Sequence, residues 1–319
     1  MQTALSPSAS ASIKIVTTDD PQGQKFVEKC RAHYNKARLD PDRAQRLNES
    51  AEFSEALVKL IAEHSQTDRF KEEVVASSAV YPKTYTGPKE IAVQVATVAA
   101  LFRLNPMDAH KYIKHVLPTL VSPLDMGVGA EGNFAFPSPF ALAAQMFPEV
   151  TDPKDQICRL TTLVLDKLEQ SLKPKWKNWR KGEIVLGRYE LHARTVQAFE
   201  RLHQEQSGDI WIFPAQLGML HRGESDNRAL ETLLPEEFPL GAFLVCACTL
   251  VHPERLSDPS ELDMNCGDRF APEADGVFSR SCFLYFFGWI DGQARFDTRD
   301  LSFVVDCFGL ASGFFPRRK

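Results

Sequence analysis

The chain of 319 residues is 44% apolar and 25% charged, and its formal net charge is -5. This acidic balance argues against a surface built to bind nucleic acid, and no apolar run reaches the roughly 20 residues that cross a bilayer. Seven cysteines, an odd number, and an N-terminus without a secretory pattern predict reduced thiols in a cytoplasmic protein.

The first part of the chain is predicted to be helical. Residues 1–19 are rich in Ser and Ala and indicate a disordered leader. A stripe of Phe26, Cys30 and Tyr34 then indicates a helix, and Asp40-Pro41 begins another that continues to Ile61. Four further helix starts are expected, at Gly87-Pro88, Asn105-Pro106, Ser138-Pro139 and Asp152-Pro153.

One feature interrupts this helical region, and a further helix ends it. The glycine-rich stretch from Gly127 to Phe136 is expected to form a loop that leads into a short strand. Tyr189 to His203 is predicted to be a helix that pairs with the one after Asp152, across the connection from Lys173 to Gly187.

From Gly208 onward, strand-like runs alternate with turns. The predicted strands are Ile210–Phe213, Phe283–Ile290, Gln293–Asp297 and Leu301–Val305. Asp291-Gly292 predicts a tight two-residue hairpin turn, because its glycine tolerates a positive φ. Leu240 to Val251 fits a helix or a strand, and its length and composition favour a buried helix. The predicted fold class is therefore α+β, with a mainly helical region over residues 20–206 and a mixed α/β module with a β-hairpin over residues 207–319.

The segment Pro214 to Asp226 follows a buried strand and carries the candidate ligand-binding residues Gln216, His221, Arg222, Glu224 and Asp226. A histidine exchanges protons near neutral pH, a carboxylate can orient it, and an arginine binds anions. The catalytic candidates are therefore His221, Arg222 and Glu224. The alternative is a polar turn that leads into a helix capped by Ser225 or Asp226.

Cysteine chemistry is a weaker hypothesis. Cys266 as a nucleophile would need His221 or His252 as its base, oriented by Asp263 or Asp268. The set Cys246, Cys248, His252 and Cys266 lacks the spacing of a known zinc site. Buried structural thiols explain both patterns more simply, so neither a metal nor a cofactor is expected.

A basic connection, KPKWKNWRKGE, interleaves lysines with Trp176 and Trp179. This combination suits single-stranded nucleic acid or an acidic protein surface. Because the whole chain is acidic, a loop anchored by its tryptophans is favoured, as is a protein partner over nucleic acid. No membrane partner is expected.

Four segments resemble parts of uncharacterised bacterial proteins: GAEGNFAFP at Gly129–Pro137, PAQLGMLHRGES at Pro214–Ser225, HPERL at His252–Leu256 and FAPEADGVFS at Phe270–Ser279. These proteins have no assigned reaction, so the resemblance implies no catalytic residue. It implies a bacterial cytoplasmic protein, of the kind that mobile elements also carry.

Two functions stay open. A binding or accessory protein would use its helical part as a docking surface, with Trp176, Trp179 and the neighbouring lysines at the partner. An enzyme, either a hydrolase or a transferase, would hold a small anionic or amide substrate with His221 as acid/base and Arg222 as charge stabiliser. The lack of a familiar catalytic motif favours the binding function.

Overall fold

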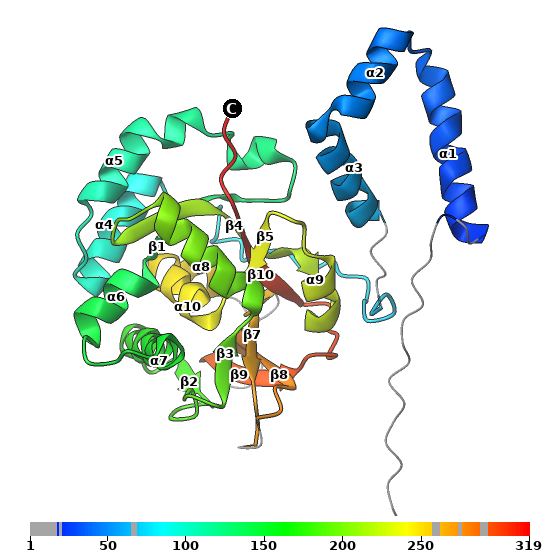
Figure 1. Cartoon of the computed structure of the whole chain (residues 1–319). Helices are drawn as coiled ribbons and strands as arrows, with labels where there is room; N and C mark the ends of the chain where they lie inside the picture. Colours follow the sequence, from blue (N-terminus) through cyan, green and yellow to red (C-terminus); the bar gives the residue numbers. More distant parts are fainter. Residues whose placement is uncertain (1–17, 19–20, 65–68, 257–261, 274–275, 288–292) are drawn as a thin grey trace, which may run out of the picture. The chain divides into compact units, whose positions relative to one another are not determined.

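The chain divides at Thr67, far from the boundary expected near residue 207. The computed structural model describes residues 18, 21–64, 69–256, 262–273, 276–287 and 293–319. Its two units are residues 1–67 and 68–319 (Figure 1). Residues on both sides of 207 share one sheet, because Gly132–Pro137 pairs with Ile210–Arg222. Apart from Thr18, the predicted leader lies outside the described residues.

The N-terminal unit consists of α1 (Pro21–Ala37), α2 (Pro41–Glu49) and α3 (Ala51–His64). Asp40 caps α2 as predicted, since its Oδ1 accepts the Arg43 N–H at 2.8 Å. The single helix expected from Pro41 to Ile61 is broken at Ser50. Ser50 is extended, and its hydroxyl accepts the Phe53 N–H at 3.0 Å, so it ends α2 and caps α3.

The second unit begins with helices. They are α4 (Ile91–Phe102), α5 (Met107–His115), the 3-10 turns η1 (Leu117–Thr119) and η2 (Pro123–Met126), α6 (Pro139–Met146), α7 (Pro153–Leu172) and α8 (Ala193–Glu205). The helix starts predicted at Ser138 and Asp152 are confirmed, because both side chains cap the following turn. The helix predicted from Tyr189 is wrong over its first residues, which form a strand before His192 caps α8.

The described residues contain ten strands in one mixed sheet, which confirms the α+β class. They are β1 (Gly132–Pro137), β2 (Trp176–Asn178), β3 (Tyr189–Leu191), β4 (Ile210–Arg222), β5 (Glu237–Pro239), β6 (Asp263–Asn265), β7 (Asp268–Phe270), β8 (Arg280–Phe287), β9 (Gln293–Asp300) and β10 (Phe308–Phe314). The main order is β1-β4-β10-β6-β8-β7-β3. In addition, β5 pairs with β10, and β9 pairs with β8 and β2. β10 runs parallel to β6 and antiparallel to β4 and β5.

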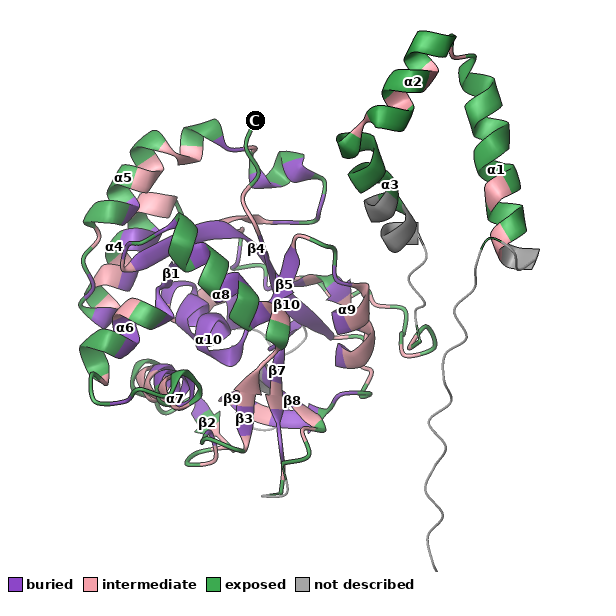
Figure 2. Cartoon of the chain, viewed as in Figure 1, coloured by how far each residue is buried: buried purple, intermediate pink, exposed green. Residues whose placement is uncertain are grey.

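Three helical segments interrupt the later strands: α9 (Asp226–Thr232), α10 (Ala242–Val251) and η3 (Pro253–Leu256). The buried helix favoured for Leu240–Val251 is confirmed by α10. This helix contacts α7, β1 and α4, and all of its residues except Leu250 are buried (purple in Figure 2). It has no polar face because protein surrounds it on every side.

The end of the chain differs from the prediction in two places. The antiparallel pairing of β8 with β9 is confirmed, and Asp291-Gly292 lies outside the described residues. Gln293 pairs with Phe287, whereas a two-residue turn would pair it with Ile290. The strand expected over Leu301–Val305 is absent: the Phe303 N–H bonds the Asp300 carbonyl in a turn, and the next strand, β10, begins at Phe308.

Candidate functional site

The predicted site segment is not a loop over most of its length, because β4 continues through it to Arg222. An irregular stretch around Gly218, whose φ is +115°, lets the strand pass close to Gly309 of β10. Buried Gln216 satisfies two local donors there: its Oε1 accepts the N–H groups of Gly218 and Leu220, at 2.7 and 3.2 Å. The strand therefore persists because a side chain replaces the missing sheet partners.

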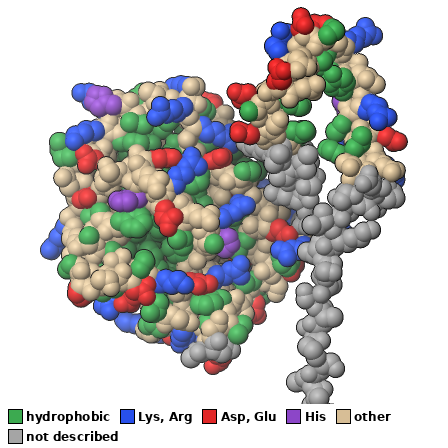
Figure 3. Space-filling model, viewed as in Figure 1, with side chains coloured by type: hydrophobic (Ala, Val, Ile, Leu, Met, Phe, Trp, Pro, Cys, Tyr) green, Lys and Arg blue, Asp and Glu red, His purple; other side chains and the backbone are tan. Residues whose placement is uncertain are grey.

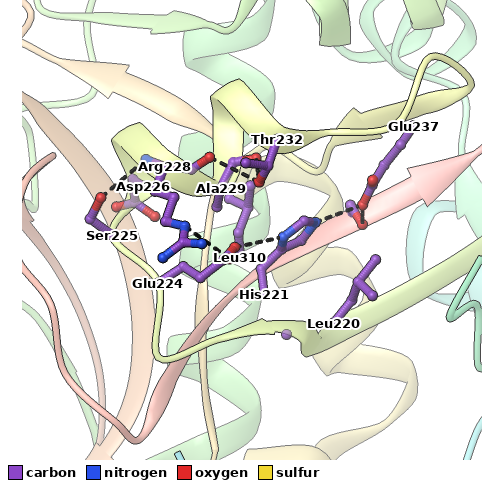
Figure 4. Close-up of polar contacts among 12 residues, drawn as sticks. Leu220, His221, Glu224, Ser225, Asp226, Arg228, Ala229, Thr232, Glu237 and Leu310 are labelled. Carbon is purple, nitrogen blue, oxygen red and sulfur yellow. Dashed lines mark hydrogen bonds and ion pairs between the residues drawn. The ribbon is translucent and has the colours of Figure 1, made fainter. Parts of the chain in front are cut away.

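A continuous polar chain runs inward from this stretch. The Gln216 amide donates to Ser312 Oγ at 2.8 Å, and Ser312 donates to Glu237. On the other side of that carboxylate, His221 Nε2 lies 2.9 Å from Glu237 Oε1, and His221 Nδ1 lies 3.0 Å from Glu224 Oε2. Figure 4 shows the imidazole between these two carboxylates. Arg228 of α9 completes the chain, with its Nε 3.4 Å from Glu224 Oε1. These six residues are called the His221 network below.

The protonation state of His221 follows from these contacts. Burial alone lowers the pKa of the imidazole, but the hydrogen bonds and charges of Glu224 and Glu237 outweigh it and raise the pKa to about 9. Both ring nitrogens therefore donate at neutral pH. Since only 5% of His221 is exposed, the imidazolium is a buried ion between two carboxylates, without the open approach that an acid/base catalyst needs.

The other two predicted residues lie elsewhere. Arg222 is half-buried and donates to the Ala79 carbonyl at 2.9 Å and to Met219 Sδ at 3.1 Å. Asp226 is buried, accepts from Asn265 at 2.9 Å and from Ser281, and lies 3.9 Å from Arg299 Nε. Burial raises the pKa of Asp226, against the opposing effects of Arg299 and these two hydrogen bonds. The five candidates thus do not converge on one pocket.

The turn alternative fits α9 well. Ser225 is the N-cap of this helix, and its hydroxyl accepts the Arg228 N–H at 3.1 Å. The network residues that sequence reasoning missed are Glu237, Ser312 and Arg228. A signal existed for Glu237, which stands in an apolar context next to Phe238, because a carboxylate in a buried strand requires a partner.

The two tryptophans of the basic connection separate. Trp176 is 7% exposed and belongs to β2, whereas Trp179 is 49% exposed with Lys177 over its ring. Several neighbouring cations are paired, including Lys181 with Glu169 at 2.8 Å and Arg180 with Asp297 at 2.7 Å. Trp176 is therefore an anchor of the loop, and only Trp179 is available to a ligand.

The cysteine hypotheses find no support in the geometry. Cys246, Cys248 and Cys266 are buried, and burial raises the pKa of each thiol, which is the opposite of what a nucleophile needs. His252 stands edge-on to the rings of Tyr85 and Phe134.

Within the described ranges, no group of three or more His, Cys, Asp or Glu side chains is arranged to hold a metal ion. The searched residues also include no helix long and apolar enough to cross a membrane.

Sequence analysis missed an apolar groove between α6, α7 and α8, which has a volume of about 600 Å³ and is called the α6–α8 groove below. Its apolar lining includes Phe140, Ile157, Leu160, Leu191, Val196 and Phe199. Its polar edge includes Lys154, Glu190 and Glu200. Hydrophobic side chains gather on the face of the molecule that carries α6 and α8 (Figure 3). The sequence shows Val196 and Phe199 only as part of a helix face, and it does not show that the face is left partly uncovered.

Comparisons with known proteins add no family. No protein-family model matches the chain, and searches of curated proteins and of solved structures found no match either.

Proposed function

We propose that the chain is a binding or accessory protein that receives an apolar, basic segment of a partner protein in the α6–α8 groove. The observation that carries the proposal is the lining: apolar side chains from three helices surround a volume of about 600 Å³. Within this lining, Val196 is 43% exposed and Phe140 is 36% exposed. Partly exposed apolar side chains gathered in a concave site, with a polar edge, are typical of recognition sites.

The charge of the groove selects the partner. Lys154 Nζ lies 3.8 Å from Glu190, so these two charges largely offset each other. Glu200 on α8 adds a negative charge, and within the described ranges this carboxylate forms no ion pair. A segment that places apolar side chains in the groove and a lysine or arginine near Glu200 would therefore bind better than an acidic one.

The enzyme alternative is less well supported. It needs His221 to give up a proton near neutral pH, but the two carboxylates hold that proton to about pH 9.

All seven cysteines are free, which fits the cytoplasmic location that the binding proposal assumes.

Synthetic amphipathic helical peptides test the proposal. Two fluorescent peptides share a leucine face and carry either lysines or glutamates on the polar face, and anisotropy measures their binding to the full chain. We expect the lysine peptide to bind at least tenfold more tightly. Val196→Gln should weaken its binding about tenfold, since one buried valine contributes about 1.5 kcal/mol.

A matched control is available in Val185→Gln. Val185 is also 43% exposed, but it lies outside the groove lining. Equal losses from the two substitutions would mean that the peptide binds nonspecifically. A lack of preference for the lysine peptide would contradict the charge argument, and no binding of either peptide would overturn the proposed function.

A further inference from the structure

The described residues of the N-terminal unit form no core of their own. Among its residues whose exposure is described, none is buried. Phe26, Tyr34, Phe53, Leu57 and Leu60 are between 36% and 52% exposed. Isolated helices of this length are marginal in water, and helical stability in proteins comes mainly from packing an apolar face. The three helices therefore need a surface that covers these side chains.

The exposed side chains form two stripes at helical spacing. On α1, Phe26, Cys30 and Tyr34 are each four residues apart. On α3, Phe53, Leu57 and Leu60 are separated by four and then three residues, which is the spacing of a helix that packs along another helix. Figure 1 shows α1 and α3 as separate helices joined through α2. Because the large apolar side chains of both stripes are exposed within one chain, neither stripe covers the other.

The two helices carry opposite charges. The sequence of α1 contains four lysines and arginines against one glutamate, Glu28. The sequence of α3 contains three glutamates against one lysine, Lys59. A basic amphipathic helix and an acidic one are complementary in both apolar and electrostatic terms, whereas two copies of either helix would repel each other.

We infer that the partner of this unit is a second copy of the chain, with α1 of each copy packed against α3 of the other. Two such contacts related by a twofold axis satisfy both stripes in both copies, which is the usual form of a homodimer. The contact buries Phe26 and Tyr34 of one copy against Phe53, Leu57 and Leu60 of its partner. The pairing is weakened by salt, since its selectivity comes from exposed charges.

Sedimentation of the full chain over a range of concentrations tests the inference. We expect a monomer–dimer equilibrium. Lys25→Glu with Lys29→Glu reverses the sign of α1 and should weaken dimerisation at least tenfold at low salt. Glu52→Lys with Glu55→Lys reverses α3 and should do the same, and all four changes together should restore the dimer, because the two helices are again complementary.

Phe53→Gln with Leu57→Gln should abolish the dimer at any salt concentration. These positions are exposed in the single chain, so the main thermal transition should not change, which excludes misfolding as the cause. Val196→Gln is the control for the groove and should leave dimerisation unchanged. A wild-type monomer at all concentrations, a dimer that ignores these variants, or a failure of the four changes to restore it would each overturn the inference.

Discussion

The His221 network and the α6–α8 groove distribute polar and apolar side chains in opposite ways. The network places an imidazolium, two carboxylates and an amide inside the molecule, where β4, β5, β10 and α9 meet (Figure 4). The groove leaves Phe140 and Val196 partly exposed on the surface (Figure 3). The ionisable residues of the network are thus enclosed, whereas the accessible concave surface is lined mainly by apolar side chains.

This difference shows what a cluster of polar residues in a sequence can mean. In the network, each ionised group has a partner: His221 bonds two carboxylates, Glu237 also accepts from Ser312 and the Leu234 N–H, and Glu224 also meets Arg228. A buried polar group that is fully partnered holds elements together, whereas one that acts on a ligand must keep a free side. Exposed apolar side chains in a concave surface carry more information about binding.

The largest effect is expected where Gly309 of β10 packs against Gly218 of β4, its antiparallel neighbour. A Cβ at position 309 would overlap the Gly218 carbonyl oxygen, which is backbone and has no room to move. Gly309→Ala should therefore separate the strands that bring Ser312 opposite Gln216, and should destabilise the protein by more than about 4 kcal/mol. Urea denaturation measures this loss.

Gly182→Ala is the matched control for that substitution. Gly182 has a φ of +82° and open space around its Cβ position, so alanine costs only the backbone strain of about 1 to 2 kcal/mol. If the two variants are equally stable, the approach of Gly309 to Gly218 is not as close as the structure indicates.

Local signals made the helix starts predictable from the sequence. Asp40, Ser138 and Asp152 each precede a proline and accept a hydrogen bond from the first turn, so the cap needs no distant partner. The break at Ser50 was missed because the apolar residues used for the prediction, from Phe53 to Ile61, all follow it, and their helical spacing carries no sign of a break. A serine there competes for the backbone donors, and the spacing alone does not record that competition.

The strands were harder to predict because their partners are distant in sequence. β4 continues past Phe213 only because Gln216 and the neighbouring β10 satisfy its donors. The candidate site illustrates the same limit. His221 and Glu224 are three residues apart and contact each other, but Glu237 is sixteen residues from His221, and Ser312 of the neighbouring strand β10 is 75 residues from Glu237. No local pattern shows that these partners close around the histidine.

The pH dependence of stability tests the network with an intermediate effect. The pKa of His221 is about 9 when folded and about 6.5 when unfolded, so its contribution is complete below about pH 6.5 and is lost as the pH rises through 9. The shift corresponds to about 3 kcal/mol. The stability difference between wild type and His221→Gln should shrink by about that amount over this range.

Comparing the two proteins at each pH removes the contributions of other groups that titrate nearby, such as Asp268, whose pKa burial raises to about 7. Parallel stability curves for wild type and His221→Gln would mean that His221 does not carry the buried charge. The contrast between network and groove would then rest on hydrogen bonds and burial, without a buried charge on His221.

The smallest effect on stability is expected in the groove. Val196→Gln replaces a side chain that is 43% exposed, and glutamine suits a helix at least as well as valine does. The free energy of unfolding should therefore change by no more than about 0.5 kcal/mol, as for most surface positions. Urea denaturation of this variant beside His221→Gln gives the contrast directly. A loss of more than about 1.5 kcal/mol from Val196→Gln would show that the side chain is part of the core, and the groove would then be a packing defect rather than a surface kept open for a partner.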